Sequence, residues 1–169
     1  ASYNYTNIWA EYGSGSLWLG AGLKSKTTNT GFYSSYGGSS FARSAIELES
    51  FSGGGIKFFT SAAQTVATDG VITVDERLRI DSSGNVLVGT TDTTVFSNGD
   101  SASEGIVLRN GEVIDIARKG DLQLTLNRQT NDGPHIAFYR SGGVRSYIST
   151  RNNAFCIDVN SAERLRIGS

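Results

Sequence analysis

The chain has 169 residues, which suffices for one domain or two small ones, and only 38% of them are hydrophobic. Its 15 basic and 16 acidic residues leave a net charge of −1, which provides neither a basic surface for nucleic acid nor a polybasic membrane patch. No apolar run approaches the roughly 20 residues that span a bilayer, so we expect no membrane insertion. The single cysteine excludes an internal disulfide, and the lack of methionine indicates a piece of a longer chain.

Alternation of apolar and polar residues, which is typical of half-buried strands, recurs through the first half of the chain. The alternating runs lie at residues 16–20, 45–50, 55–59, 70–74, 76–80 and 85–89. In the second of these runs, Ile46 and Leu48 lie opposite Glu47 and Glu49. Between the last two runs, a polar break contains Gly84, which can adopt a positive φ, so we expect a hairpin there.

The second half of the chain alternates in the same way and has clearer turn signals. Asn110-Gly111 lies between two alternating runs and predicts a tight hairpin. Further strands are expected at residues 122–126, 135–139, 144–148 and 154–159. Strands at a spacing of roughly 8–12 residues are typical of an all-β meander. We therefore predict an all-β fold of short antiparallel strands.

One charged pentapeptide occurs twice. Glu-Arg-Leu-Arg-Ile stands at residues 76–80 and returns at residues 163–167. Residues 53–61 and 133–141 also resemble each other, and each segment precedes one copy of the pentapeptide. The expected parts are an aromatic, Gly/Ser-rich β module at 1–52, a first β repeat at 53–95 and a second β repeat at 96–169.

The strands offer few apolar side chains for a core. Full burial of one Val, Leu, Ile or Phe contributes roughly 1.5–3 kcal/mol. Ordering the backbone of one residue costs roughly 1–2 kcal/mol. Sparse strands with long Gly/Ser turns balance these terms poorly in a lone chain, so we expect several copies to share one core.

Two segments carry a family resemblance. Residues 76–91, which read ERLRIDSSGNVLVGTT, resemble a phrase of bacteriophage tail-fibre and related virion-fibre proteins, where it often lies near a C-terminal self-cleaving intramolecular chaperone. Residues 124–149 resemble a second phrase of those fibres. The resemblance covers about residues 53–169, and the chaperone itself is absent. Because relatives are cut after a serine, Ser169 fits a processing end and equally an arbitrary boundary.

The resemblance implies an elongated parallel homotrimer, built of β-sandwich or interwoven β-helix modules. It also implies an extracellular place on the virion, contacts with other tail proteins, and attachment to a bacterial surface glycan or outer-membrane receptor. In such a trimer the pentapeptides would fix chain register, with Leu and Ile at the shared axis and Glu and Arg pairing outside. The residues concerned are Glu76, Arg77, Leu78, Arg79, Ile80, Glu163, Arg164, Leu165, Arg166 and Ile167.

Aromatic residues concentrate before residue 60 and suit either sugar contact or a packed core. The segment 27–41, with Tyr33 and Tyr36 among Ser and Gly, resembles an adaptable binding loop. Together with Trp9 and Trp18, these tyrosines are the candidate ligand-binding residues.

No catalytic residue, metal or cofactor is expected. His135 is the only histidine, Cys156 lies in a strand pattern, and Asp81 lacks the further ligands of a calcium loop. Glu47 and Glu49 lie about 7 Å apart along a strand, which alone does not make a glycosidase pair. The leading hypothesis is a trimeric, receptor-binding segment of a phage tail fibre. The alternatives are a purely structural shaft or capsid-decorating fibre, and a polysaccharide-degrading spike.

Overall fold

The structure is a computed structural model that describes residues 6–11, 13–26, 31–51, 53–99, 103–152, 154–160 and 162–168. It divides into two compact units, Ala1–Gln123 and Leu124–Ser169. Apart from the short 3-10 helix η1 (Val95–Ser97), all regular elements of the described residues are strands. The predicted all-β fold is therefore confirmed.

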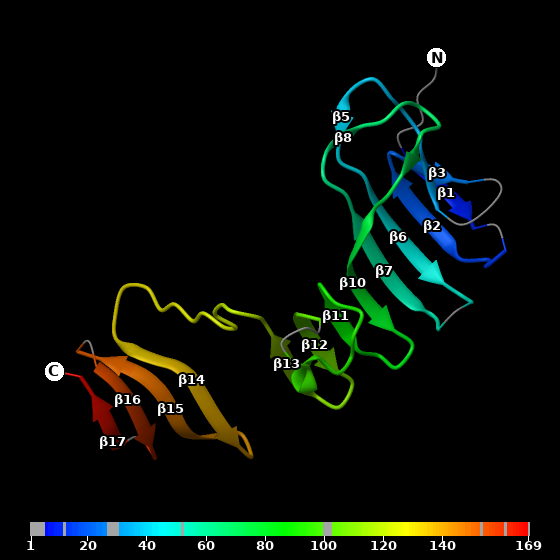
Figure 1. Ribbon diagram of the computed structural model, residues 1–169. Helices are drawn as coiled ribbons and strands as arrows, with labels where there is room; N and C mark the ends of the chain where they lie inside the picture. The colour runs from blue at the N-terminus through cyan, green and yellow to red at the C-terminus, as the bar shows by residue number, and fades with distance from the viewer. Residues whose placement is uncertain are drawn as a thin grey trace. The chain divides into compact units, whose positions relative to one another are not determined.

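The first unit contains a large antiparallel sheet (Figure 1). Its strands, in spatial order, are β1 (Thr6–Ala10), β2 (Leu17–Ala21), β6 (Ser44–Glu49), β7 (Gly55–Thr60), β10 (Asp75–Asp81), β11 (Val86–Val88), β12 (Gly105–Arg109) and β13 (Val113–Ala117). This one sheet runs through the divisions expected near residues 52 and 95.

Two small sheets are formed by segments that lie, along the chain, between strands of the large sheet. They comprise β3 (Leu23–Ser25), β4 (Phe32–Ser34) and β9 (Val71–Ile72), and β5 (Ser40–Phe41) with β8 (Gln64–Thr65). The three-stranded sheet contributes Leu23 and Ile72 to a core with Trp18 and Ala45. A second core lies around Leu87, Val95 and Val107. Both cores cover the same face of the large sheet, because strand pairing aligns Trp18 with Leu87 across β6, β7 and β10.

The second unit is a four-stranded antiparallel meander. Its strands are β14 (Gly133–Arg140), β15 (Gly143–Arg151), β16 (Ala154–Val159) and β17 (Ala162–Ile167). They pair in chain order, so β14 and β17 form the two edges of the sheet (Figure 1).

Two predicted hairpins are confirmed and one predicted strand is wrong. Gly84 has a φ of 82° in the turn between β10 and β11, and the turn after Asn110 joins β12 to β13. Residues 122–126, however, form no strand. Leu122, Leu124 and Leu126 are exposed there, because no neighbouring strand pairs with this segment in the described residues.

The two units share one pattern of strand pairing. In β2–β6–β7–β10, Leu19, Ile46, Phe58 and Leu78 stand side by side. In β14–β15–β16–β17, the corresponding residues are Ile136, Ile148, Ile157 and Leu165. By this register β16 takes the place beside the second pentapeptide that β7 takes beside the first. The sequence resemblance between residues 53–61 and 133–141 instead relates β7 to β14, which does not pair with β17.

Candidate functional site

One face of the large sheet carries two continuous apolar rows, which we call the aliphatic face. The first row is Ala10, Leu17, Leu48, Ile56, Ile80, Val86, Leu108 and Ile114. The second row is Ile8, Leu19, Ile46, Phe58, Leu78, Val88, Ile106 and Ile116. Each row crosses all eight strands, because directly paired residues point to the same side of a sheet.

The aliphatic face is open in the single chain. Leu48 is 40% exposed and Ile114 is 64% exposed. Of the sixteen side chains in the two rows, eleven are exposed: Ile8, Ala10, Leu17, Leu19, Leu48, Phe58, Ile80, Val88, Ile106, Leu108 and Ile114. A contiguous apolar surface of this kind marks an interaction site in soluble proteins.

A shallow apolar hollow lies on this face where the second row borders smaller side chains. Leu19, Ile46 and Phe58 form its wall, and Ala21 and Ser44 leave the space beside them. The hollow can receive a side chain of a partner.

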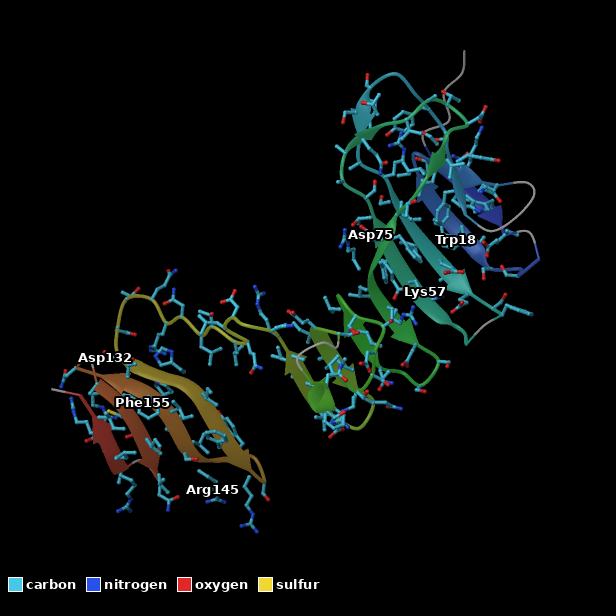
Figure 2. All side chains as sticks on the ribbon, in the orientation of Figure 1. Trp18, Lys57, Asp75, Asp132, Arg145 and Phe155 are labelled. Carbon is cyan, nitrogen blue, oxygen red and sulfur yellow. The ribbon has the colours of Figure 1, made fainter. Side chains whose placement is uncertain are left out.

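The opposite face carries both apolar and charged side chains and is covered. Its central row reads Trp9, Trp18, Glu47, Lys57, Arg79, Leu87, Val107 and Asp115. Figure 2 labels Trp18 and Lys57, which lie on β2 and β7. The predicted alternation is thus confirmed, and both cores of the single chain lie on this covered face rather than on the aliphatic face. Glu47 is 5% exposed, because the loops and small sheets pack on its side of the sheet.

Lys57 lies between two carboxylates on the covered face. Its Nζ is 3.5 Å from Glu47 Oε2 and 2.7 Å from Glu49 Oε1. Burial raises the pKa of Glu47, and Lys57 opposes that shift. The two glutamates considered for glycoside cleavage are therefore held by one ammonium group beneath the sheet.

Both pentapeptides fold around an extra residue. Between the pairs Glu76–Phe59 and Leu78–Phe58, the strand β10 carries one additional residue, Arg77, in a β-bulge. The bulge places the Glu76 side chain on the same side of the sheet as Arg79. Arg79 Nε lies 2.5 Å from Glu76 Oε1, and Arg79 Nη2 lies 2.6 Å from Glu76 Oε2. This ion pair lies on the covered face, opposite the side that carries Leu78 and Ile80.

The second copy repeats this geometry on β17. The extra residue is Arg164, between the pairs Asp158–Glu163 and Ile157–Leu165. Arg166 Nη1 lies 3.4 Å from Glu163 Oε2. In both copies the Leu of the pentapeptide joins a cross-strand apolar row.

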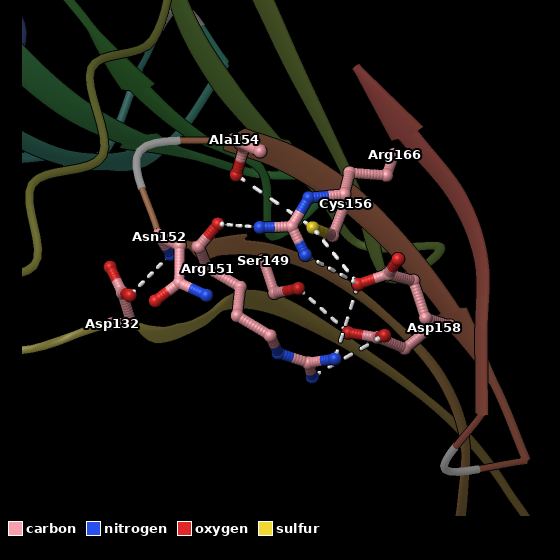
Figure 3. Close-up of polar contacts among 9 residues, drawn as sticks. Asp132, Ser149, Arg151, Asn152, Ala154, Cys156, Asp158 and Arg166 are labelled. Atoms are coloured by element: carbon pink, nitrogen blue, oxygen red, sulfur yellow. Dashed lines mark hydrogen bonds and ion pairs between the residues drawn. The ribbon is translucent and has the colours of Figure 1, made fainter. Parts of the chain in front are cut away.

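A charged network covers the polar face of the second unit (Figure 3). Ser149 Oγ donates a hydrogen bond of 2.7 Å to Asp158 Oδ2, and Arg151 approaches both Asp158 and Glu163. Arg166 Nη2 donates to the Arg151 carbonyl oxygen at 2.9 Å. These long side chains cover the sheet without an apolar layer.

Cys156 is fully buried beneath this network. Burial raises the pKa of its thiol, and a hydrogen bond to Glu163 at 3.6 Å raises it further. The thiol is therefore held in its protonated form.

The aliphatic face of the second unit is smaller and also open. Phe138, Phe155, Val159, Leu165 and Ile167 are exposed on the side that carries Ile148 and Ile157. Phe155, labelled in Figure 2, is 43% exposed.

The candidate ligand-binding aromatics divide into interior and partly exposed residues. Trp18 is 4% exposed and packs edge-on against Phe32 at 4.8 Å between centroids, and Trp9 stacks on it at 6.0 Å. Trp9 and Tyr33 are half-buried, and Lys26 Nζ lies 5.7 Å from the Tyr33 ring centre. Residues 27–30 of the expected binding loop lie outside the described residues, as does Ser169.

Tyr36 is an interior residue that holds a buried arginine. Its ring is 6% exposed and lies 5.0 Å from the guanidinium carbon of Arg43, which is itself buried. Arg43 Nη1 donates to the carbonyl oxygens of Phe41 and Gln64, and Nη2 donates to Ser34 Oγ. This packing makes Tyr36 part of the loop's framework rather than of its surface.

Other chemistry-bearing residues have local partners. His135 Nε2 lies 3.0 Å from Thr150 Oγ1, and the Asp81 carboxylate accepts hydrogen bonds from Ser83 and Asn85 in the turn. Within the described residues, no three His, Cys, Asp or Glu side chains gather to hold a metal ion. No helix of the described part of the chain has the length and hydrophobicity to cross a membrane.

Comparison of the chain with protein-family models, curated proteins and solved structures gave no match in any of the three.

Proposed function

We propose that this chain is a segment of a phage tail fibre on the virion surface, which assembles as a homotrimer and serves host attachment. The aliphatic face would form the shared interior, with the pentapeptides fixing register. The observation that carries this proposal is the pair of apolar rows that cross eight strands and stay open in one chain.

Three features support self-association as the use of this face. The face contains no charged side chain in its two rows, so a partner must be equally apolar. The opposite face is already covered by the chain's own loops and small sheets, which leaves the aliphatic face as the remaining large apolar surface of the described sheet. Copies of one chain offer the same rows to each other around an axis, as closed symmetry requires.

Molar mass in solution tests the assembly. The wild-type chain should sediment at three times 18.0 kDa. Phe58→Asp places a charge in the middle of the second row and should shift the mass to a single chain, while the far-ultraviolet circular dichroism stays that of β-structure. Phe51→Asp is the matched control, because Phe51 is also exposed but lies outside both rows.

A wild-type chain that stays at 18.0 kDa at micromolar concentration would overturn the shared interior. So would a Phe58→Asp variant that keeps the trimer mass.

The burial of Trp18 and Tyr36 favours a second candidate, a structural shaft or capsid-decorating fibre without receptor binding. Glycan-array binding of the wild type and of Tyr33→Ala separates the two. Receptor binding predicts a glycan signal that Tyr33→Ala weakens, because Tyr33 is only half-buried. If neither the wild type nor Tyr33→Ala gives a glycan-binding signal, the result supports the structural shaft.

A further inference from the structure

We propose that the outer edge of β17 is a docking site for an extended strand with the sequence pattern of β11, in which valines alternate before a glycine. This inference concerns pairing at a sheet edge. It does not depend on trimer formation through the aliphatic face.

The first step is the equivalence of β10 and β17. Both strands carry the same pentapeptide, the same bulge at its first arginine and the same Glu–Arg ion pair. Both also pair on their inner side in the same register, with Leu78 beside Phe58 and Leu165 beside Ile157. The two strands therefore present equivalent outer edges.

The second step is that the outer edge of β10 is occupied. There β11 pairs antiparallel, with Leu78 beside Val88 and Ile80 beside Val86. Gly89 N–H donates to the Arg77 carbonyl oxygen at 2.9 Å, and Asp81 N–H donates to Asn85 at 3.0 Å. Because backbone groups alternate in direction along a strand, the Arg79 N–H and C=O also point toward β11.

The third step is that, among the residues that the structure describes, no strand pairs with the corresponding edge of β17. β17 ends the sheet order of the second unit, and all six of its residues are exposed (Figure 1). By equivalence with Arg77 and Arg79, the backbone groups of Arg164 and Arg166 face outward. A row of unpaired N–H and C=O groups at an edge is a template for another strand.

The chemistry of the occupant follows from the first copy. A β11-type strand would place its two valines beside Leu165 and Ile167, which are both exposed. The pairing would thus extend the apolar row of the second unit by one strand while it satisfies the backbone of Arg166.

A peptide with the sequence of residues 82–91, fluorescently labelled, tests the site on the full chain. We expect saturable binding by anisotropy, and an Arg166 amide whose hydrogen exchange slows by about tenfold or more at saturation. A peptide N-methylated at the amide of Leu87 keeps every side chain but loses the donor expected to face Arg166, and it should not bind.

Four outcomes would overturn the proposal. One is the absence of binding by the unmodified peptide. Another is equal binding by the N-methylated peptide. The third is protection confined to another sheet edge, such as β13 or β14. Slow exchange of Arg166 without peptide, together with a concentration-dependent mass, would assign the edge to a second β17 and would equally rule out a β11-type occupant.

Discussion

Glu76 and Arg79 form a two-point ion pair along one strand, and a β-bulge at Arg77 places them on the same side. Glu163 and Arg166 repeat the relationship on β17. The repeated pentapeptide is therefore a unit of local geometry, in which one extra residue, one ion pair and one leucine in a cross-strand apolar row occur together.

A double-mutant cycle with Glu76→Gln and Arg79→Gln should give a coupling energy of about 1 kcal/mol, because the pair is bidentate and half-buried. The cycle for Glu163 and Arg166 should give less, since this pair makes a single longer contact. Urea unfolding at low and high salt provides the measurement. Equal coupling in both copies, or no decline in salt, would contradict this account.

Trp18→Ala should lower the free energy of unfolding by about 3–5 kcal/mol, the usual cost of truncating a buried large aromatic. Trp18 packs against Trp9, Phe32 and Phe59, which cannot close the space it leaves. Phe96→Ala is the control, because Phe96 is exposed and contacts Arg109 across its ring. Denaturant unfolding monitored by near-ultraviolet circular dichroism should show a much smaller loss for the control.

Glu47→Gln should change the pH dependence of stability. Burial raises the pKa of Glu47 from its ordinary value of 4.5, so the folded chain takes up this proton more readily than the unfolded chain. The wild type should therefore gain stability relative to Glu47→Gln as the pH falls from the raised pKa toward 4.5, and lose it as the pH rises. Unfolding free energies between pH 4 and 8 provide the measurement, and parallel profiles of the two proteins would refute it.

Asp81→Asn should show the opposite trend. Burial of the Asp81 carboxyl raises its pKa, but the hydrogen bonds from Asn85 and Ser83 outweigh this and leave the pKa below its ordinary value of 3.8. The carboxylate thus stabilises the turn above pH 3.8, and this contribution is lost as the pH falls through the lowered pKa. We expect the variant to lose about 1 kcal/mol at pH 7 and to match the wild type in strong acid. If the variant stays less stable than the wild type in strong acid, its loss of stability comes from the changed shape of the side chain and not from the missing charge.

The strands and hairpins were largely predictable from sequence, because alternation and turn residues are local signals. Ile46 and Leu48 lie opposite Glu47 as expected. Alternation says which residues share a face, however, and not which face is covered. That depends on Leu23, Phe32 and Ile72, which reach the sheet from distant parts of the chain. Residues 122–126 show the same limit, since an alternating run forms no strand without a partner.

The aliphatic face and the bulges were not predicted. The face depends on the register of eight strands, and a register is set between segments rather than within them. A signal for it was present, because nearly every strand has two apolar residues at positions i and i+2. A signal for the bulge was the spacing of Glu76 and Arg79, since three residues along a regular strand would place an ion pair on opposite sides.

The burial of Cys156 provides a natural probe of how often the sheet of the second unit opens. It is the only thiol in the chain, and it is shielded by arginine and glutamate side chains rather than by a second layer of structure. An alkylating reagent can reach it only when β17 lifts away from β16 or the side chains above it part. The alkylation rate of the unmodified protein would therefore report the rate at which that sheet opens locally, without any introduced label.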